Sequence, residues 1–222
     1  DKYHIIHYDP LNVGFSTTFE DGWKYIGVSK VACNGYKAIT GHECELIYNP
    51  VVIDKPKVEK KKDKIYLISA TRLTSEKGGA RINKLANMLD NAGVNYEWNI
   101  YTNRTRYRFD SPNIIVHQQK LDLTKEIAEA SFLVQLSDCE SFGLSVCESL
   151  ILGTPVIITP LEAFKEIVST KTYKKSTISF SCCNKASFNS IIDGEYIWLS
   201  VFNKLCIWHG NQGFPKAPRP II

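Results

Sequence analysis

Residues 137–148 read Ser-Asp-Cys-Glu-Ser-Phe-Gly-Leu-Ser-Val-Cys-Glu, and an apolar run lies on each side of this segment. The run at residues 132–136 predicts a buried strand, and residues 144–152 are typical of a helix. A Gly-Thr-Pro turn and a second apolar run at residues 156–158 follow. The segment therefore spans the point where a strand ends and a helix begins, which is the edge of an open α/β sheet where ligands bind. Free backbone N–H groups and the positive end of the helix dipole favour a phosphate there.

Two carboxylates, Glu140 and Glu148, belong to this segment and have seven residues between them. Phe-Gly-Leu at residues 142–144 lies between them, and Gly-Thr-Pro-Val at residues 153–156 comes afterwards. The full string resembles the E-x7-E signature of retaining glycosyltransferases of the GT-B fold, family 4, also called glycosyl transferases group 1. The alternative is an ordinary strand–helix junction in which one carboxylate is exposed and the other caps the helix.

Strands and helices alternate along most of the chain. Strands are predicted at residues 24–28, 44–48, 65–70, 96–101, 114–116, 132–136 and 156–158, and helices at residues 30–39, 79–91, 122 or 124 to 130, and 144–152. Ser29 is expected to cap the first helix, and Gly41 to end it. This alternation predicts an α/β fold with a Rossmann-like parallel sheet and helices on both faces. The resemblance identifies this sheet with the C-terminal half of a GT-B fold.

Three segments are expected on this basis. Residues 1–53 resemble the end of an N-terminal, acceptor-side domain, and their first twenty residues are expected to be loop-rich with room for one strand. Residues 54–168 form the nucleotide-sugar-binding, Rossmann-like domain. It opens with a lysine-rich run, which is either a solvated linker or a patch that touches anionic lipid headgroups. Residues 169–222 are an atypical tail, which either folds differently from the family or is not family sequence.

Two cations are candidates for a diphosphate site. When a sugar leaves a nucleotide diphosphate, charge grows on the outer phosphate, and without a metal it must be stabilised by fixed cations and oriented amides. Arg72 and Lys77 follow the strand at residues 65–70, and their spacing resembles the Arg and Lys pair of the family's diphosphate site. They are assigned as catalytic, with surface loop cations as the alternative. Gly78, followed by Gly79, is assigned to donor binding because it lets a backbone approach closely; the alternative is that it only loosens a turn.

The resemblance assigns the remaining donor contacts to the central segment. Glu148 would accept hydrogen bonds from the ribose hydroxyls, a task that suits a carboxylate. Glu140, assigned as catalytic, would face the hydroxyls of the donor sugar. Backbone amides would contact sugar or phosphate at Phe142, Gly143 and Leu144. No metal site is expected.

Recognition of the base is expected from the loops that follow the strands ending near Tyr101 and Val116. His117 and Gln118 are the candidates there, although a lone histidine is more often structural. Glu166 matches a family position weakly and is otherwise a surface acid. No His-Glu-x-x-His, nucleophile-elbow or Walker-type motif is present.

Composition restricts the classes of function. The chain has 44% hydrophobic residues and a net charge of +4, which suits an anionic small ligand or lipid surface and is too weak to indicate nucleic acid. No apolar run approaches the roughly 18–20 residues of a membrane span. Seven scattered cysteines favour reduced thiols. The expected location is therefore cytoplasmic, with peripheral contact at the inner membrane face as an option.

The resulting expectation is a hexosyltransferase-type enzyme of polysaccharide biosynthesis, in fragment form. It would transfer a sugar, with retention of configuration, from a nucleotide sugar to a glycan or lipid-linked acceptor. The expected donor is a UDP-sugar, and no cofactor or metal is expected. Because only about fifty residues precede the linker, the chain alone is expected to bind donor weakly and to transfer poorly. The alternatives are a non-catalytic half-domain that binds nucleotide or a partner, and a sugar-nucleotide epimerase.

Overall fold

The strands form two parallel sheets in the computed structural model, which describes residues 1–13, 18–168 and 177–179. The first sheet has the order β1-β2-β3, with bounds β1 (Lys2–Ile6), β2 (Trp23–Gly27) and β3 (Glu45–Leu46). The second has the order β6-β5-β4-β7-β8-β9, with bounds β4 (Ile65–Ala70), β5 (Tyr96–Thr102), β6 (Ile114–Gln118), β7 (Phe132–Gln135), β8 (Val156–Ile158) and β9 (Thr177–Ser179). Both sheets fit the predicted α/β fold class.

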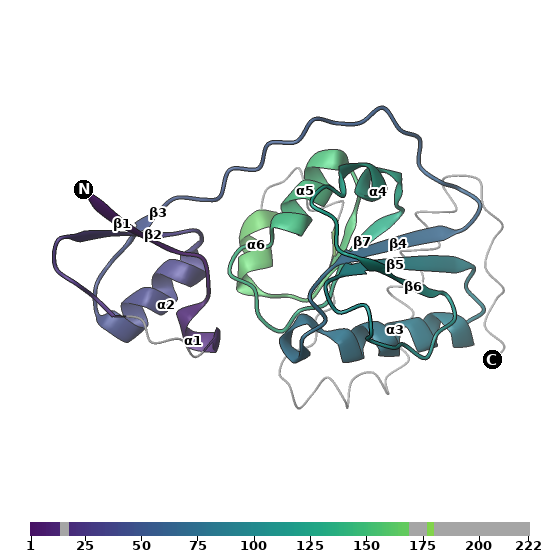
Figure 1. Ribbon diagram of the computed structural model, residues 1–222, viewed down its shortest axis with the longest axis horizontal. Helices are drawn as coiled ribbons and strands as arrows, with labels where there is room; N and C mark the ends of the chain where they lie inside the picture. The colour runs from purple at the N-terminus through teal and green to yellow at the C-terminus, as the bar shows by residue number, and fades with distance from the viewer. Residues whose placement is uncertain (14–17, 169–176, 180–222) are drawn as a thin grey trace.

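Helices cover both faces of the second sheet (Figure 1). These helices are α3 (Gly79–Asn91), α4 (Thr124–Glu129), α5 (Leu144–Leu152) and α6 (Glu162–Val168). Helices α1 (Pro10–Val13) and α2 (Lys30–Thr40) lie beside the first sheet. One core packs α3 against the sheet, where Leu67 on β4 lies among the apolar residues of that helix. The other core packs α4, α5 and α6 against the opposite face, which includes Ile68. Neighbouring residues of β4 thus enter opposite cores, as the two-residue period of a strand requires.

The local signals at helix ends explain α2 and α3. The side chain of Ser29 accepts a hydrogen bond from the backbone N–H of Ala32 at 3.0 Å, and Gly41 ends α2 in the left-handed conformation. Helix α3 buries Ile82, Leu85, Ala86 and Leu89, which recur at helical spacing. The predicted cap, stop and apolar face of these helices are confirmed.

The order of the second sheet reverses between β4 and β7. From β4 the chain continues outward to β5 and β6, and it then returns to the other side of β4 for β7, β8 and β9. In the register, Leu67 of β4 pairs with Trp98 of β5 and with Phe132 of β7. Such a reversal leaves a crevice at the carboxyl ends of the two central strands, where ligands of open α/β sheets bind.

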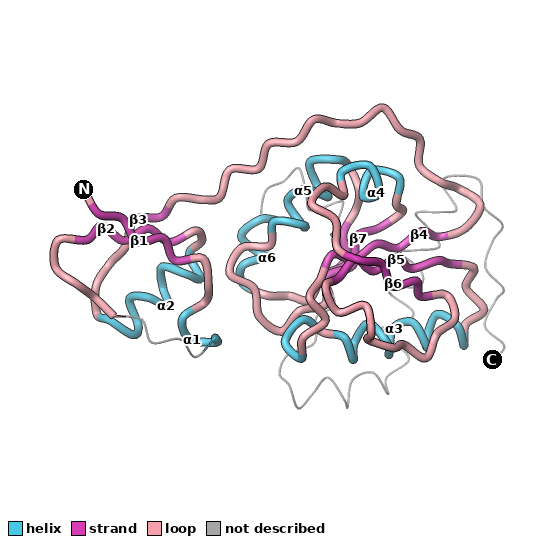
Figure 2. Tube along the Cα trace, viewed as in Figure 1, coloured by secondary structure: helices cyan, strands magenta, loops and turns pink. Residues whose placement is uncertain are grey.

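A long loop joins the two sheets and contains the lysine-rich run (Figure 2). It is held at Lys60, whose Nζ donates to the backbone oxygens of Ala128 and Ala130 and to Oγ1 of Thr154 at 2.7–3.3 Å. Burial among these groups lowers the pKa of Lys60 to about 8. Lys61 and Lys64 also contact the sheet unit, through Glu129 and Glu97, so the run is not a wholly solvated linker.

Several parts of the fold differ from expectation. The predicted strand at residues 44–48 is reduced to the two residues of β3, and the N-terminal twenty residues contain the helix α1 in addition to one strand, β1. Strand β9 pairs in parallel with β8 within a tail for which no regular element was expected. The rest of that tail, residues 169–176 and 180–222, lies outside the described residues. In the described part, no helix is long and apolar enough to cross a membrane.

Candidate functional site

A cavity of about 590 Å³ lies at the carboxyl edge of the second sheet, where the strand order reverses. Its lining comes from the ends of β4, β5 and β6, from the loop and first turns after β7, and from two residues of the N-terminal part, His7 and Asn49. Seven of the eight assigned site residues line it: Arg72, Lys77, Glu140, Phe142, Gly143, Leu144 and Glu148. Parallel topology thus brings segments seventy residues apart to one site.

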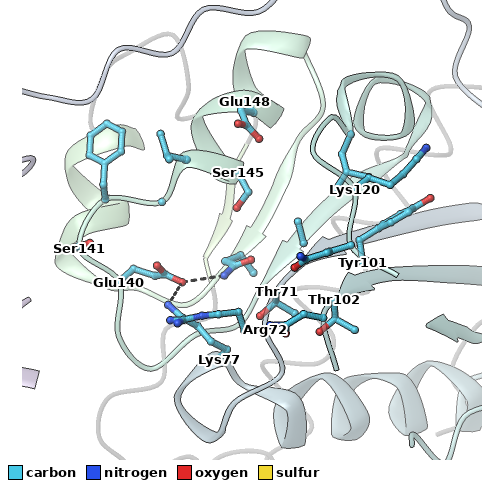
Figure 3. A pocket seen from close by; sticks show the side chains of 18 of the residues that line it. Thr71, Arg72, Lys77, Tyr101, Thr102, Lys120, Glu140, Ser141, Ser145 and Glu148 are labelled. Atoms are coloured by element: carbon cyan, nitrogen blue, oxygen red, sulfur yellow. Dashed lines mark hydrogen bonds and ion pairs between the residues drawn. The ribbon is translucent and has the colours of Figure 1, made fainter. Parts of the chain in front are cut away.

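Lys77 and Glu140 form an ion pair with 2.7 Å between Lys77 Nζ and Glu140 Oε1 (Figure 3). Their side chains are only 13% and 15% exposed. Lys77 Nζ also donates to the backbone oxygen of Cys139 at 3.1 Å. Such low exposure means that both charges are held in one geometry before a ligand arrives, which is the condition for electrostatic stabilisation without reorganisation.

Arg72 is held much more loosely. Its side chain is 66% exposed, and its Nη2 lies 3.9 Å from Oε1 of Glu76. An exposed pair at this distance contributes little to stability. Its planar guanidinium can therefore turn toward an anion in the cavity and bind two oxygens at once. Beside it, the hydroxyl oxygen of Thr71 is buried and has no hydrogen-bond partner within the part of the chain that the structure describes.

Helix α5 points its N-terminus at the cavity. Gly143 precedes it with φ of +98°, and a Cβ there would lie 2.6 Å from Cε1 of Phe164. Glycine is therefore required both by the left-handed backbone and by the packing of α6. The first N–H groups of α5, which begins at Leu144, face outward as donors for an anion.

Glu148 lies one turn into α5 and faces the same cavity across from Tyr101 and Lys120 (Figure 3). Burial raises the pKa of its carboxyl group, and the negative charge of Asp122 raises it further. A half-buried carboxylate with unused acceptor capacity is suited to a pair of vicinal hydroxyls.

Gly78 does not line the cavity, unlike the other assigned residues. Its φ is +77°, and a Cβ there would lie 1.9 Å from the backbone oxygen of Leu136. Its backbone approaches the backbone of Leu136 closely, so packing between the loops that follow β4 and β7 is sufficient to explain this glycine.

The base candidates His117 and Gln118 also lie outside the cavity lining. His117 bonds to Oδ1 of Asn99 at 2.6 Å and stacks on Tyr101, which is a structural role. The cause is the length of β6, which continues to Gln118, so that the loop begins two residues later than predicted. The residues that reach the cavity are Gln119 and Lys120.

Several other functional candidates were missed by sequence reasoning. Asp138, which was not assigned a role, forms an ion pair with Arg81. The hydroxyl of Ser141 donates to the backbone oxygen of His7 at 2.7 Å and so joins the central segment to the N-terminal part. Glu166 is not a plain surface acid, because its two oxygens accept from the backbone N–H of Lys30 at 3.0 and 3.2 Å. These contacts join residues far apart in the sequence, so no local pattern pointed to them.

The comparisons with known proteins agree with this geometry. The family model described as "Glycosyl transferases group 1" matches residues 52–192, more than half of the sequence. The chain belongs to the glycosyl transferases group 1 family. A comparison with curated protein sequences gave no match.

Solved structures with the same fold are glycosyltransferases of the GT-B type. TarM has a TM-score of 0.65 at 16% identity, with 92% of this chain and 44% of that chain covered. WaaG, a glycosyltransferase involved in lipopolysaccharide biosynthesis, has a TM-score of 0.60 at 12% identity, with 88% and 61% covered. The pneumococcal O-GlcNAc transferase GtfA, in complex with UDP and GlcNAc, has a TM-score of 0.56 at 17% identity, with 81% and 38% covered. This chain therefore spans less than two thirds of each of these proteins.

Proposed function

We propose that the cavity binds a nucleotide sugar and that the chain supplies the donor side of a retaining family 4 glycosyltransferase. The observation that carries the proposal is the meeting of Arg72, Lys77, Glu140 and Glu148 in one cavity at the reversal of the sheet. The transferase family supports the reaction class. Among the structural neighbours, GtfA was crystallised with UDP, which makes a UDP-sugar the proposed donor.

The diphosphate is placed between the end of β4 and the start of α5. Arg72 and Lys77 approach from the β4 side, and the first N–H groups of α5 approach from the other. As the bond from the sugar to the outer phosphate breaks, negative charge grows on that phosphate. Lys77 and the helix N–H groups are fixed before binding, and Arg72 turns toward the phosphate, so no metal is required in this proposal.

The ribose and the sugar are placed by the two glutamates. Glu148 accepts hydrogen bonds from the ribose hydroxyls, and Glu140 accepts them from hydroxyls of the donor sugar. Departure of the phosphate and attack of the acceptor on the same face would retain the configuration of the sugar. We propose a glycan or lipid-linked acceptor approaching from the side of His7 and Asn49, the two cavity-lining residues of the N-terminal part. A cytoplasmic location, with contact at the inner membrane face, belongs to the same proposal.

Titration calorimetry with UDP, GDP and ADP tests the proposal. One nucleotide, expected to be UDP, should bind, and Arg72→Ala and Glu148→Ala should each weaken it by about 1–3 kcal/mol, which is roughly 5- to 150-fold. Lys165→Ala is the matched control, because Lys165 forms an exposed pair with Glu162 outside the cavity lining. If neither cavity variant weakens the best nucleotide, the assigned site is wrong.

A further inference from the structure

The side chain of Gln135 is buried at the end of β7, directly behind Glu140. Gln135 is 5% exposed, and its Nε2 donates to Oε1 of Glu140 at 3.0 Å and to Oγ of Ser137 at 2.9 Å. The hydroxyl of Ser137 in turn donates to the same Oε1 at 2.8 Å. The amide thus supports Glu140 both directly and through the serine.

All donors to Glu140 gather on one of its two oxygens. Oε1 receives Gln135, Ser137 and Lys77, the last at 2.7 Å. Among the described residues, Oε2 receives no side-chain donor. A carboxylate with one oxygen fixed by several donors has one rotamer, and its second oxygen keeps its acceptor capacity for a ligand.

The amide of Gln135 is only half satisfied. Its Oε1 is buried and has no hydrogen-bond partner among the described residues. A buried carbonyl oxygen without a donor destabilises the fold, whereas an apolar side chain of the same length would leave no such group. The position is therefore not explained by the stability of the strand. In natural proteins, exceptions to the rule that buried polar atoms are hydrogen-bonded are expected mainly at functional sites.

We propose that Gln135 is a positioning residue that fixes Glu140 to receive the hydroxyls of the donor sugar. This inference rests on the proposed function, in which Glu140 contacts the sugar and Glu148 contacts the ribose. Gln135 is expected to act mainly on the sugar, because its hydrogen bonds reach Glu140 and Ser137 and none of the residues placed at the diphosphate or ribose. Lys77, which shares Oε1 of Glu140 with it, is also held by the backbone oxygen of Cys139. Loss of the amide should then weaken a nucleotide sugar but spare the free nucleotide.

The test is a pair of titrations, with UDP and with UDP-N-acetylglucosamine, on the chain and on Gln135→Met. The ratio of the two dissociation constants isolates the contribution of the sugar. We expect Gln135→Met to weaken the binding of UDP-N-acetylglucosamine relative to that of UDP by about fivefold or more, with UDP affinity unchanged within about twofold. Ser137→Ala should shift the ratio in the same direction. Gln135→Glu should shift it further, since it places a second carboxylate beside Glu140.

Ser69 on β4 provides the control for a purely structural effect. It is fully buried, its hydroxyl donates to the backbone oxygen of Val134 at 2.7 Å and accepts from Trp98 Nε1 at 3.0 Å, and it does not line the cavity. Ser69→Ala should lower the melting temperature and leave the ratio unchanged. Gln135→Met should change the ratio and keep a melting temperature equal to or above that of the unchanged chain.

The inference can be overturned in two ways that the experiment distinguishes. UDP binding with an unchanged ratio in Gln135→Met, or a fall in melting temperature as large as that of Ser69→Ala, would reduce Gln135 to a structural residue and leave the proposed function standing. Failure of the unchanged chain to bind any of UDP, GDP and ADP would remove the proposed function, and this inference would fall with it.

Discussion

The charged residues of the cavity differ in how firmly they are held before a ligand binds. Lys77 and Glu140 are paired at 13% and 15% exposure, whereas Arg72 is 66% exposed. The buried pair sets a fixed charge pattern, and the exposed arginine adjusts to the anion. Ordering a long, exposed side chain costs entropy at the moment of binding, so Arg72 is the side chain expected to change rotamer most.

The raised pKa of Glu148 predicts how the stability of the fold depends on pH. Its folded pKa is raised, first by burial and then by Asp122, so the charged form is disfavoured in the fold. Above that pKa the ionised carboxylate lowers stability, and the loss disappears as the pH falls toward the ordinary pKa of glutamate, about 4.3. Glu148→Gln should therefore melt at a higher temperature than the chain near pH 7.

The two melting temperatures should converge as the buffer is taken toward about pH 4. Thermal scans of both proteins at several pH values provide the measurement. Glu162→Gln is the matched control, since Glu162 is 74% exposed and lies outside the cavity lining. A variant that melts below the chain near pH 7 would mean that the ionised carboxylate stabilises the fold.

At the scale of elements, the loop after β4 packs closely against the loop after β7 at Gly78. Gly78 combines a φ of +77° with a Cβ position 1.9 Å from the backbone oxygen of Leu136. Gly93, after α3, has a φ of +65° but nothing within 4 Å of its Cβ position. Gly78→Ala should therefore lower the free energy of unfolding by more than about 2 kcal/mol, and Gly93→Ala by only about 1 kcal/mol.

Urea denaturation of the two alanine variants measures the difference. The backbone at Leu136 has no flexible side chain to move aside, so the clash at Gly78 has to be relieved by moving one of the two loops. Equal destabilisation by the two variants would show that the loops separate freely, and the packing explanation for Gly78 would fail.

The elements that could be predicted from sequence are those with complete local signals. Residues 65–70, 79–91, 144–152 and 156–158 are observed with the predicted bounds as β4, α3, α5 and β8. An apolar pattern marks each of these elements, and a glycine precedes each of the two helices. Strand β1 gave no such signal, because only Ile6 of its five residues is buried. Strand β9 was missed because its place depends on pairing with β8.

The site was predictable as far as one segment or one strand end defines it. Glu140 and Glu148 share a segment, and Arg72 and Lys77 follow a clear strand, so all four reach the cavity. His117 and Gln118 do not reach the cavity, because β6 extends to Gln118, two residues past its apolar run. The contacts of Gln135 with Glu140 depend on tertiary geometry, and no local pattern encodes them.

At the scale of the whole molecule, the N-terminal part contacts the larger sheet unit near the cavity. Glu166 of α6 accepts from the first N–H of α2, which places a carboxylate at the positive end of that helix. Ser141, beside Glu140, donates to the backbone of His7. Because Ser141 and His7 both line the cavity, the N-terminal part is expected to shape the side from which an acceptor enters.

A structure of the chain with UDP bound, determined by crystallography, tests the proposed donor site most directly. We predict that the diphosphate lies beside Arg72, Lys77 and the N-terminus of α5, with the ribose hydroxyls against the carboxylate of Glu148. A nucleotide bound on another surface, or seated in the cavity with its ribose away from Glu148, would contradict it.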